Sequence, residues 1–142
     1  MTLAPPPQGE YVPGARHGQL ITTAGMTSRV RGVAQLVGTI GAELTKEDGL
    51  RAVRVAAENA ADAVAGLLRP GETVSQCLRL TVYLVCAPGF TEHSAMADAA
   101  SAYLRQRWGA AALGPRTAIG VANLPGGQPA EVEVTAIARR YR

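Results

Sequence analysis

The sequence predicts an α+β fold in which two helices pack on one face of a mixed β-sheet. Two segments with helical periodicity, residues 45–68 and 90–108, are separated by an alternating segment at residues 75–86. A β-rich hairpin precedes the first helix, and two further β-rich segments follow the second. This order of strands and helices is typical of a layer of helices packed on a sheet.

The chain of 142 residues has the usual size of one domain, so we predict a single domain over residues 1–142 with an extended lead-in over residues 1–10. Hydrophobic residues make up 47% and charged residues 18%, which excludes a disordered chain. No apolar run approaches the ~20 residues that cross a bilayer. The first residues lack the basic and apolar regions of a secretory signal, so we expect a cytoplasmic location.

The N-terminal part of the chain predicts a hairpin followed by a loop. Residues 11–25 carry two short β-rich runs around His17-Gly18, and a glycine-containing turn between such runs is typical of a β-hairpin. Residues 26–44 are punctuated by glycine and contain several β-branched residues. We expect a loop and one further short strand there.

The first helix is predicted over residues 45–68. Thr45, followed three residues later by Asp48, resembles a helix N-cap with its capping partner. Apolar residues then recur at helical spacing and the opposite stripe is charged, so one face of this helix should pack on a core. Arg69-Pro70-Gly71 should end it.

The second half of the chain predicts a strand, a helix and two closing strands. Residues 75–86 alternate, with one face formed by Leu78, Leu80, Val82 and Leu84 and the other by Arg79, Thr81 and Tyr83. Residues 90–108 predict a second, alanine-rich helix. The closing strands are expected at about residues 116–121 and 132–138, joined by Leu124-Pro125-Gly126-Gly127.

Two helices can cover only one face of this sheet. The other face would carry Tyr83, Val85, Ile119 or Ile137, which is too apolar a surface to leave in water. We therefore expect the chain to form a homo-oligomer that buries this face, with sites between subunits.

Several classes of site find no support in the sequence. Cys77 and Cys86 lie on one predicted strand, about 30 Å apart at ~3.3 Å per residue, so they cannot form a disulfide. No His or Cys stands near them at ligand spacing, so we predict no metal site. Signatures of nucleotide-binding loops, zinc proteases and serine hydrolases are absent. His17 and His93 have no neighbouring acid or nucleophile and are interpreted as surface residues.

The net charge of +3 raises the possibility that the chain binds nucleic acid. Basic residues gather toward the end of the chain, at Arg139-Arg140-Tyr141-Arg142, but no aromatic residues interleave with the arginines to stack on bases. We interpret the segment as a solvated basic tail and do not expect nucleic acid to be a partner.

The C-terminal third carries the most specific motif. Its run PRTAIGVANLPGG, followed by AEVEVTAIA, resembles the C-terminal signature of the Rid/YjgF family of reactive-intermediate deaminases. The resemblance extends over nearly the whole chain, through GEYVPGARHGQLITTAG, GTIGAELTKEDGLRAVRVAAENA and LRLTVYLVCAPGFTEH. The PGFTE turn resembles a less characterised branch of the family more than its well-studied imine deaminases.

This resemblance implies a chorismate-mutase-like homotrimer with clefts between subunits and no cofactor. It also implies hydrolytic deamination of 2-imino acids or their enamine tautomers to 2-keto acids and ammonia. The partner would then be a small substrate that bears a carboxylate.

Four residues match functional positions of the family. Arg116 falls on the arginine that holds the substrate carboxylate, a task that suits a planar, permanently charged guanidinium. Glu133 falls on the acid near the attacking water. Tyr11 falls on the tyrosine that walls the pocket, and Gly25 on a glycine whose backbone lines it. The residues themselves also admit a surface cation at Arg116, an interface ion pair at Glu133 and interface packing at Tyr11.

The chain departs from the family pattern at Ala24, Met26, Ser94 and Gly120, where fewer polar groups would line the pocket. Two alternatives to the deaminase therefore stay open. One is a relative that binds a small carboxylate ligand or serves a biosynthetic pathway. The other is an RNA-acting protein, which only the basic C-terminus supports.

Overall fold

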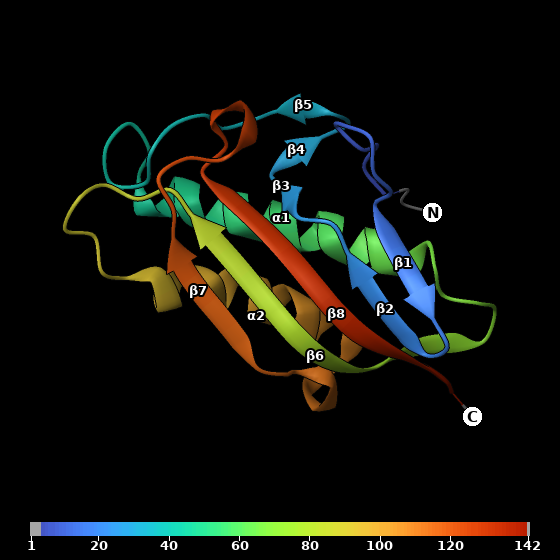
Figure 1. The fold of residues 1–142 in the computed structure, drawn as a ribbon. Helices are drawn as coiled ribbons and strands as arrows, with labels where there is room; N and C mark the ends of the chain where they lie inside the picture. Colours follow the sequence, from blue (N-terminus) through green and yellow to red (C-terminus); the bar gives the residue numbers. More distant parts are fainter. Residues whose placement is uncertain (1–3, 142) are drawn as a thin grey trace.

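The structure is a computed structural model that describes residues 4–141. Its main sheet has the strand order β1-β2-β8-β6-β7, and a short strand, β3, also pairs with β8 (Figure 1). Strands β6 and β7 are parallel and the other pairs are antiparallel, so the sheet is mixed. The strands of this sheet are β1 Gly14–His17, β2 Leu20–Thr23, β3 Met26–Thr27, β6 Glu72–Leu84, β7 Arg116–Gly120 and β8 Ala130–Arg140.

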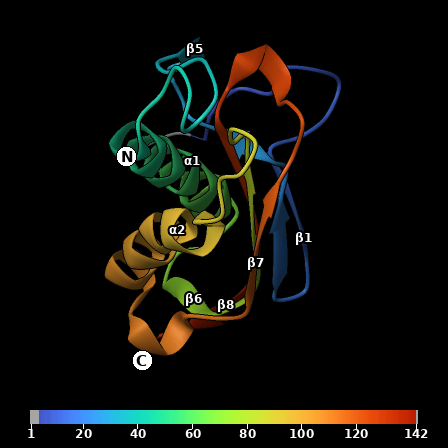
Figure 2. The same cartoon turned by 90° about the vertical axis from the view of Figure 1, so that its left-hand side faces the viewer.

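Helices α1 (Lys46–Ala65) and α2 (His93–Trp108) lie side by side on one face of this sheet, as Figure 2 shows edge-on. The predicted fold class is therefore confirmed. The segment between β3 and α1 forms a small separate hairpin of β4 (Arg29–Val30) and β5 (Val33–Ala34). Two short 3-10 helices, η1 (Ala110–Ala112) and η2 (Pro125–Gly127), flank β7.

Helix α1 begins where the sequence predicts. The Thr45 side chain accepts a hydrogen bond from the Asp48 backbone N–H, and the Asp48 carboxylate accepts one from the Thr45 N–H. This capping box fixes the first turn. The helix ends at Ala65, three residues before the predicted end, because Gly66 caps it. Alanines four residues apart, among them Ala52, Ala56 and Ala60, form part of its buried face.

Strand β6 differs from its predicted alternation at one end. Leu80, Val82 and Leu84 are buried on the helix side, but Leu78 is 43% exposed. A register shift against β8 between Cys77 and Arg79 leaves Leu78 as an extra residue in the strand. Such a bulge breaks the two-residue period, so the prediction that Leu78 shares the core face is wrong.

The face of the sheet opposite the helices is open. Ile119 of β7 is 46% exposed, Leu20 of β2 is also exposed, and Ile137 and Tyr83 are half-buried between them. The predicted apolar residues lie on this face, but Thr81, Thr117 and Glu133 separate them, so the face is mixed rather than apolar throughout. Neither helix of residues 4–141 combines the length and hydropathy that a bilayer crossing needs.

Candidate functional site

Arg116 is the first residue of β7, the edge strand next to α2, and its guanidinium is fixed by that helix. Its Nη1 donates to the Ser101 Oγ at 2.8 Å, and its Nη2 donates to the backbone oxygen and Oγ of Ser94, each at 2.9 Å. Nη1 also lies 2.8 Å from a carboxylate oxygen of Asp98, whose side chain is 72% exposed. Hydroxyl and carbonyl oxygens thus orient a cation that already binds a carboxylate at the surface.

Glu133 lies in the middle of β8, on the open face of the sheet. The Tyr83 hydroxyl donates to its Oε1 at 2.7 Å. This hydrogen bond is the main cause that raises the pKa of Tyr83 to about 12, with burial adding to it. Tyr83 therefore stays protonated at neutral pH and keeps donating to Glu133, which fixes the orientation of that carboxylate.

Arg116 and Glu133 come from opposite faces of the sheet within one chain. Thr81 of β6 pairs in register with Glu133 on one side and with Thr117 on the other. The Glu133 side chain points to the open face, whereas Arg116 contacts α2 on the helix face. A single chain therefore does not bring the two side chains into one site.

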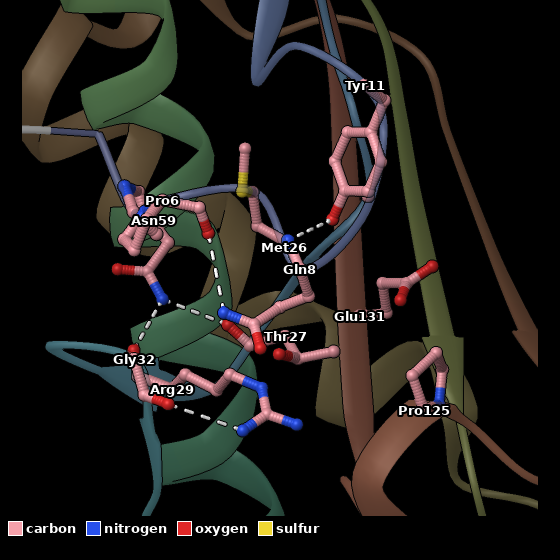
Figure 3. Close-up of a pocket in the computed structure, with 12 residues that line it drawn as sticks. Pro6, Gln8, Tyr11, Met26, Thr27, Arg29, Gly32, Asn59, Pro125 and Glu131 are labelled. Atoms are coloured by element: carbon pink, nitrogen blue, oxygen red, sulfur yellow. Dashed lines mark hydrogen bonds between the residues drawn. The ribbon is translucent and has the colours of Figure 1, made fainter.

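Tyr11 and Gly25 do share a cavity, shown in Figure 3. It lies between the N-terminal segment, α1, β3 and β8, so residues far apart in the sequence form its walls. Neither Arg116 nor Glu133 lines it. Its polar lining includes Tyr11, Thr27, Arg29, Asn59 and Glu131.

Glu131 was missed in the sequence analysis, although it lines the same cavity as Tyr11 and Gly25. A Cβ atom added to Gly25 would lie 2.5 Å from the Glu131 Oε2, so a larger residue at position 25 would displace this carboxylate. Burial is the largest cause that raises the pKa of Glu131, and the charge of Glu133 adds to it. The sequence does offer one signal for Glu131, because residues 131 and 133 share one face of any strand.

Asn59, on α1, holds the strand segment that carries Arg29. Its Nδ2 donates to the backbone oxygens of Thr27 at 2.9 Å and of Arg29 at 2.8 Å. These bonds fix one wall of the cavity to the helix layer. Helical periodicity places Asn59 on α1 but could not identify partners about thirty residues away.

Comparison with known proteins shows that solved structures share the fold of this chain. No family model matches the chain. Protein TCP17 of Trypanosoma cruzi is 29% identical over 134 residues, which cover 94% of this chain and 84% of TCP17. A candidate endoribonuclease from Shewanella oneidensis matches at 25% identity with a TM-score of 0.87, over 96% of this chain and 90% of that one.

Two Escherichia coli structures decide the assignment. The YjgF gene product is 24% identical with a TM-score of 0.66, and the match covers 94% of this chain and 92% of that one. This chain has the Rid/YjgF fold. TdcF, whose structure contains bound serine, matches at 21% identity with the same TM-score and the same coverage. The Rid/YjgF resemblance inferred from the sequence is confirmed by the fold.

Within this Rid/YjgF fold, the side chains of residues 4–141 form no group of three or more His, Cys, Asp or Glu that could hold a metal ion. Cys77 and Cys86 are both free, and burial raises the pKa of each thiol, which disfavours the reactive thiolate. The charged and hydroxyl groups of the candidate site residues are those of Arg116, Glu131, Glu133, Tyr11 and Tyr83.

Proposed function

We propose that the chain hydrolyses 2-imino acids or their enamine tautomers to 2-keto acids and ammonia. The observation that carries this proposal is the Arg116 guanidinium, which Ser94 and Ser101 orient and which already binds the carboxylate of Asp98. A guanidinium oriented in this way can hold a substrate carboxylate through two parallel hydrogen bonds. The exposed Asp98 would give way to it.

Glu133 supplies the second part of the chemistry. Because Tyr83 donates to it, its carboxyl group has a fixed orientation. An ionised carboxylate can orient the attacking water and stabilise positive charge on the imine nitrogen. Tyr11 and Gly25 would form the wall of the pocket that takes the substrate side chain.

The site would be shared between subunits of a homotrimer. Arg116 and Glu133 lie on opposite faces of one chain, so a site that uses both needs a second copy. The open face supports such an assembly, because neither α1 nor α2 covers it and it exposes the apolar side chains of Ile119 and Leu20. We propose that the catalytic cleft lies where these faces meet.

The serine in TdcF supports a small ligand of this class, since serine carries the carboxylate that Arg116 would hold. A second candidate function is binding of a small carboxylate without deamination. It is favoured by the apolar positions Ala24 and Gly120, which offer no side-chain polar group to a reacting nitrogen. An RNA-acting role, suggested by the candidate endoribonuclease from Shewanella oneidensis, would have to use the basic C-terminal strand and is not proposed.

A coupled assay tests the deaminase. An amino-acid oxidase or a threonine dehydratase generates imines in solution, and added protein should accelerate release of the 2-keto acid. Arg116→Ala should reduce kcat/KM roughly 30- to 1000-fold, which corresponds to ~2–4 kcal/mol for a charge-assisted bidentate contact. Arg116→Lys should fail too, because an ammonium cannot reproduce two fixed parallel donors.

The matched control is Arg105→Ala, which removes an exposed arginine from α2, the helix that orients Arg116, and should leave the rate unchanged. Full activity in Arg116→Ala would place the carboxylate clamp elsewhere. Carboxylate binding without any acceleration of imine hydrolysis would favour the second candidate function.

A further inference from the structure

Two glutamates on the same side of β8 have different surroundings. Glu133 accepts a hydrogen bond of 2.7 Å from the Tyr83 hydroxyl. Within residues 4–141 the Glu131 carboxylate has no hydrogen-bond or ion-pair partner, although it is only half exposed to water and lines the cavity beside Gly25. Glu133 therefore has a hydrogen-bond donor, whereas Glu131 has none among the described residues.

The position of Glu131 also differs from that of Glu133. Glu131 lies in the wall of a cavity that Tyr11, Thr27 and Asn59 complete, and Glu133 does not line it. Gly25 lets the carboxylate lie directly against the backbone, where a side chain would displace it. A small molecule in this cavity would meet the Glu131 carboxyl group (Figure 3).

We propose that Glu131 is the residue that transfers protons during hydrolysis, while Glu133, which Tyr83 holds in place, orients the attacking water. This inference rests on the proposed deaminase function. It adds a catalytic residue that the family resemblance does not supply, since that resemblance assigns the acid to Glu133.

The charged and titratable groups around Glu131 are consistent with this division. Glu133 faces it from the same strand, and its charge makes ionisation of Glu131 less favourable, as burial does. Tyr83 faces it from β6 and is engaged with Glu133, whereas Arg79 of β6 donates to Thr117 at 2.6 Å. The remaining groups that face the cavity are Tyr11 and Arg29. Burial and the charge of Glu133 both raise the pKa of Glu131, and this is the direction that favours a carboxyl group able to donate a proton.

A single carboxyl group, that of Glu131, can carry out every proton transfer of imine hydrolysis. Protonated Glu131 gives its proton to the imine nitrogen while water adds to the imine carbon, and a proton of that water passes to the Glu131 carboxylate. The resulting carbinolamine then receives this proton on nitrogen, and the C–N bond breaks with its electron pair leaving on ammonia. The hydroxyl proton returns to Glu131 as the C=O bond forms. The net reaction is imine plus water giving 2-keto acid plus ammonia.

The test compares Glu131→Gln with wild-type protein in the imine assay across pH. We expect kcat to fall about 10²–10⁴-fold and the limb of the pH profile that reports the carboxyl group to disappear. Inhibition by added pyruvate, a 2-keto acid product, should change little, because Arg116 still holds the carboxylate. Glu131→Asp should recover part of the rate, which shows that the loss does not come from misfolding.

Glu47→Gln is the matched control, since it changes an exposed glutamate on α1 and should leave both rate and pH profile unchanged. An active wild-type protein whose Glu131→Gln variant keeps its rate and its pH profile would overturn this inference alone. A wild-type protein without any activity on imines would overturn the deaminase function and the role of Glu131 together.

Discussion

Glu72, Glu131 and Glu133 carry the same carboxyl group in three different surroundings. Arg16 and a backbone N–H hold Glu72 ionised and lower its pKa to about 2. Burial without a cationic partner raises the pKa of Glu131, whereas a tyrosine hydroxyl holds Glu133. The chemistry of each residue thus follows from the groups that the fold places around it.

Glu133→Gln tests the role of the residue that the family resemblance identifies. The amide keeps the shape of the side chain but loses the charge, so kcat should fall about 10²–10⁴-fold while the oligomer stays intact. In contrast to Glu131→Gln, this variant should keep the pH limb of the proton carrier. Turnover and particle mass are measured on one preparation. A loosened oligomer with normal turnover would make Glu133 an interface residue instead.

Gly114 is a second glycine at which the structure leaves no room for a side chain. A Cβ atom there would lie 1.7 Å from the carbonyl oxygen of Cys77, which is backbone and cannot rotate away. Gly114→Ala should therefore lower the free energy of unfolding by about 3 kcal/mol or more, and shift β7 with its Arg116. Urea unfolding followed by circular dichroism measures the loss.

Gly66→Ala is the control for this change, because its added Cβ would meet atoms no closer than 3.6 Å and the backbone there is helical. Its stability should stay within about 0.5 kcal/mol of the wild-type value or rise slightly. Equal losses in both variants would refute the steric explanation for Gly114.

At the scale of elements, one ion pair joins the first hairpin to the start of β6. Arg16 of β1 donates from Nη1 and Nη2 to the Glu72 carboxylate of β6, at 2.6 and 2.9 Å, and also to the Leu67 backbone oxygen at 2.9 Å. The Arg69 N–H donates to the same carboxylate at 2.7 Å. Four hydrogen bonds thus tie β1, the end of the α1 segment and the start of β6 together.

This cluster predicts a pH dependence of stability. The pKa of Glu72 is lowered to about 2 in the folded state, so its contribution is complete above the ordinary value near 4.5 and is lost as pH falls from there toward 2. Glu72→Gln should therefore lower Tm at pH 7 but have little effect near pH 2. Thermal unfolding of both proteins across this range measures the difference. A Tm difference that does not change with pH would show that packing, rather than charge, is lost.

The elements themselves follow from local signals, whereas their irregularities do not. The capping box at Thr45 and Asp48 and the helical periodicity behind it predict α1 to within three residues. The bulge that exposes Leu78 carries no local signature, because its cause is the register against β8, far along the chain. The partners of Arg116 are likewise set by the packing of α2, which periodicity alone does not orient.

In the candidate site, too, local sequence signals predict single residues, whereas contacts between distant segments decide how these residues are arranged. Motif resemblance identifies Arg116, Glu133, Tyr11 and Gly25 one by one, but it does not say which of them meet. The strand order decides that Tyr11 and Gly25 share a cavity with Glu131 and that Arg116 lies across the sheet from Glu133. Strand parity places Glu131 on the face of Glu133, but the sequence does not show that Gly25 on another segment leaves the space in which the Glu131 carboxylate lies.

At the scale of the whole molecule, the helices leave one face of the sheet open. Ile119 is exposed on this face, on the edge strand β7 that also begins with Arg116. If this face is the trimer interface, light scattering at micromolar concentration should give about three times the chain mass of 14.7 kDa. Ile119→Glu should convert the trimer to monomers, because burying an unpaired charge costs several kcal/mol at each interface. Val33→Glu is the control, since Val33 is equally apolar and exposed but lies on the separate β4–β5 hairpin.

Activity should follow assembly in this pair of variants. Arg116 and Glu133 lie on opposite faces of one chain, so monomers of Ile119→Glu would keep both residues and still lack a complete site. We expect them to lose imine hydrolysis while Val33→Glu keeps both mass and rate. Monomers that hydrolyse imines at the wild-type rate would place the complete site within one chain, and one of the two residues would then have no part in it.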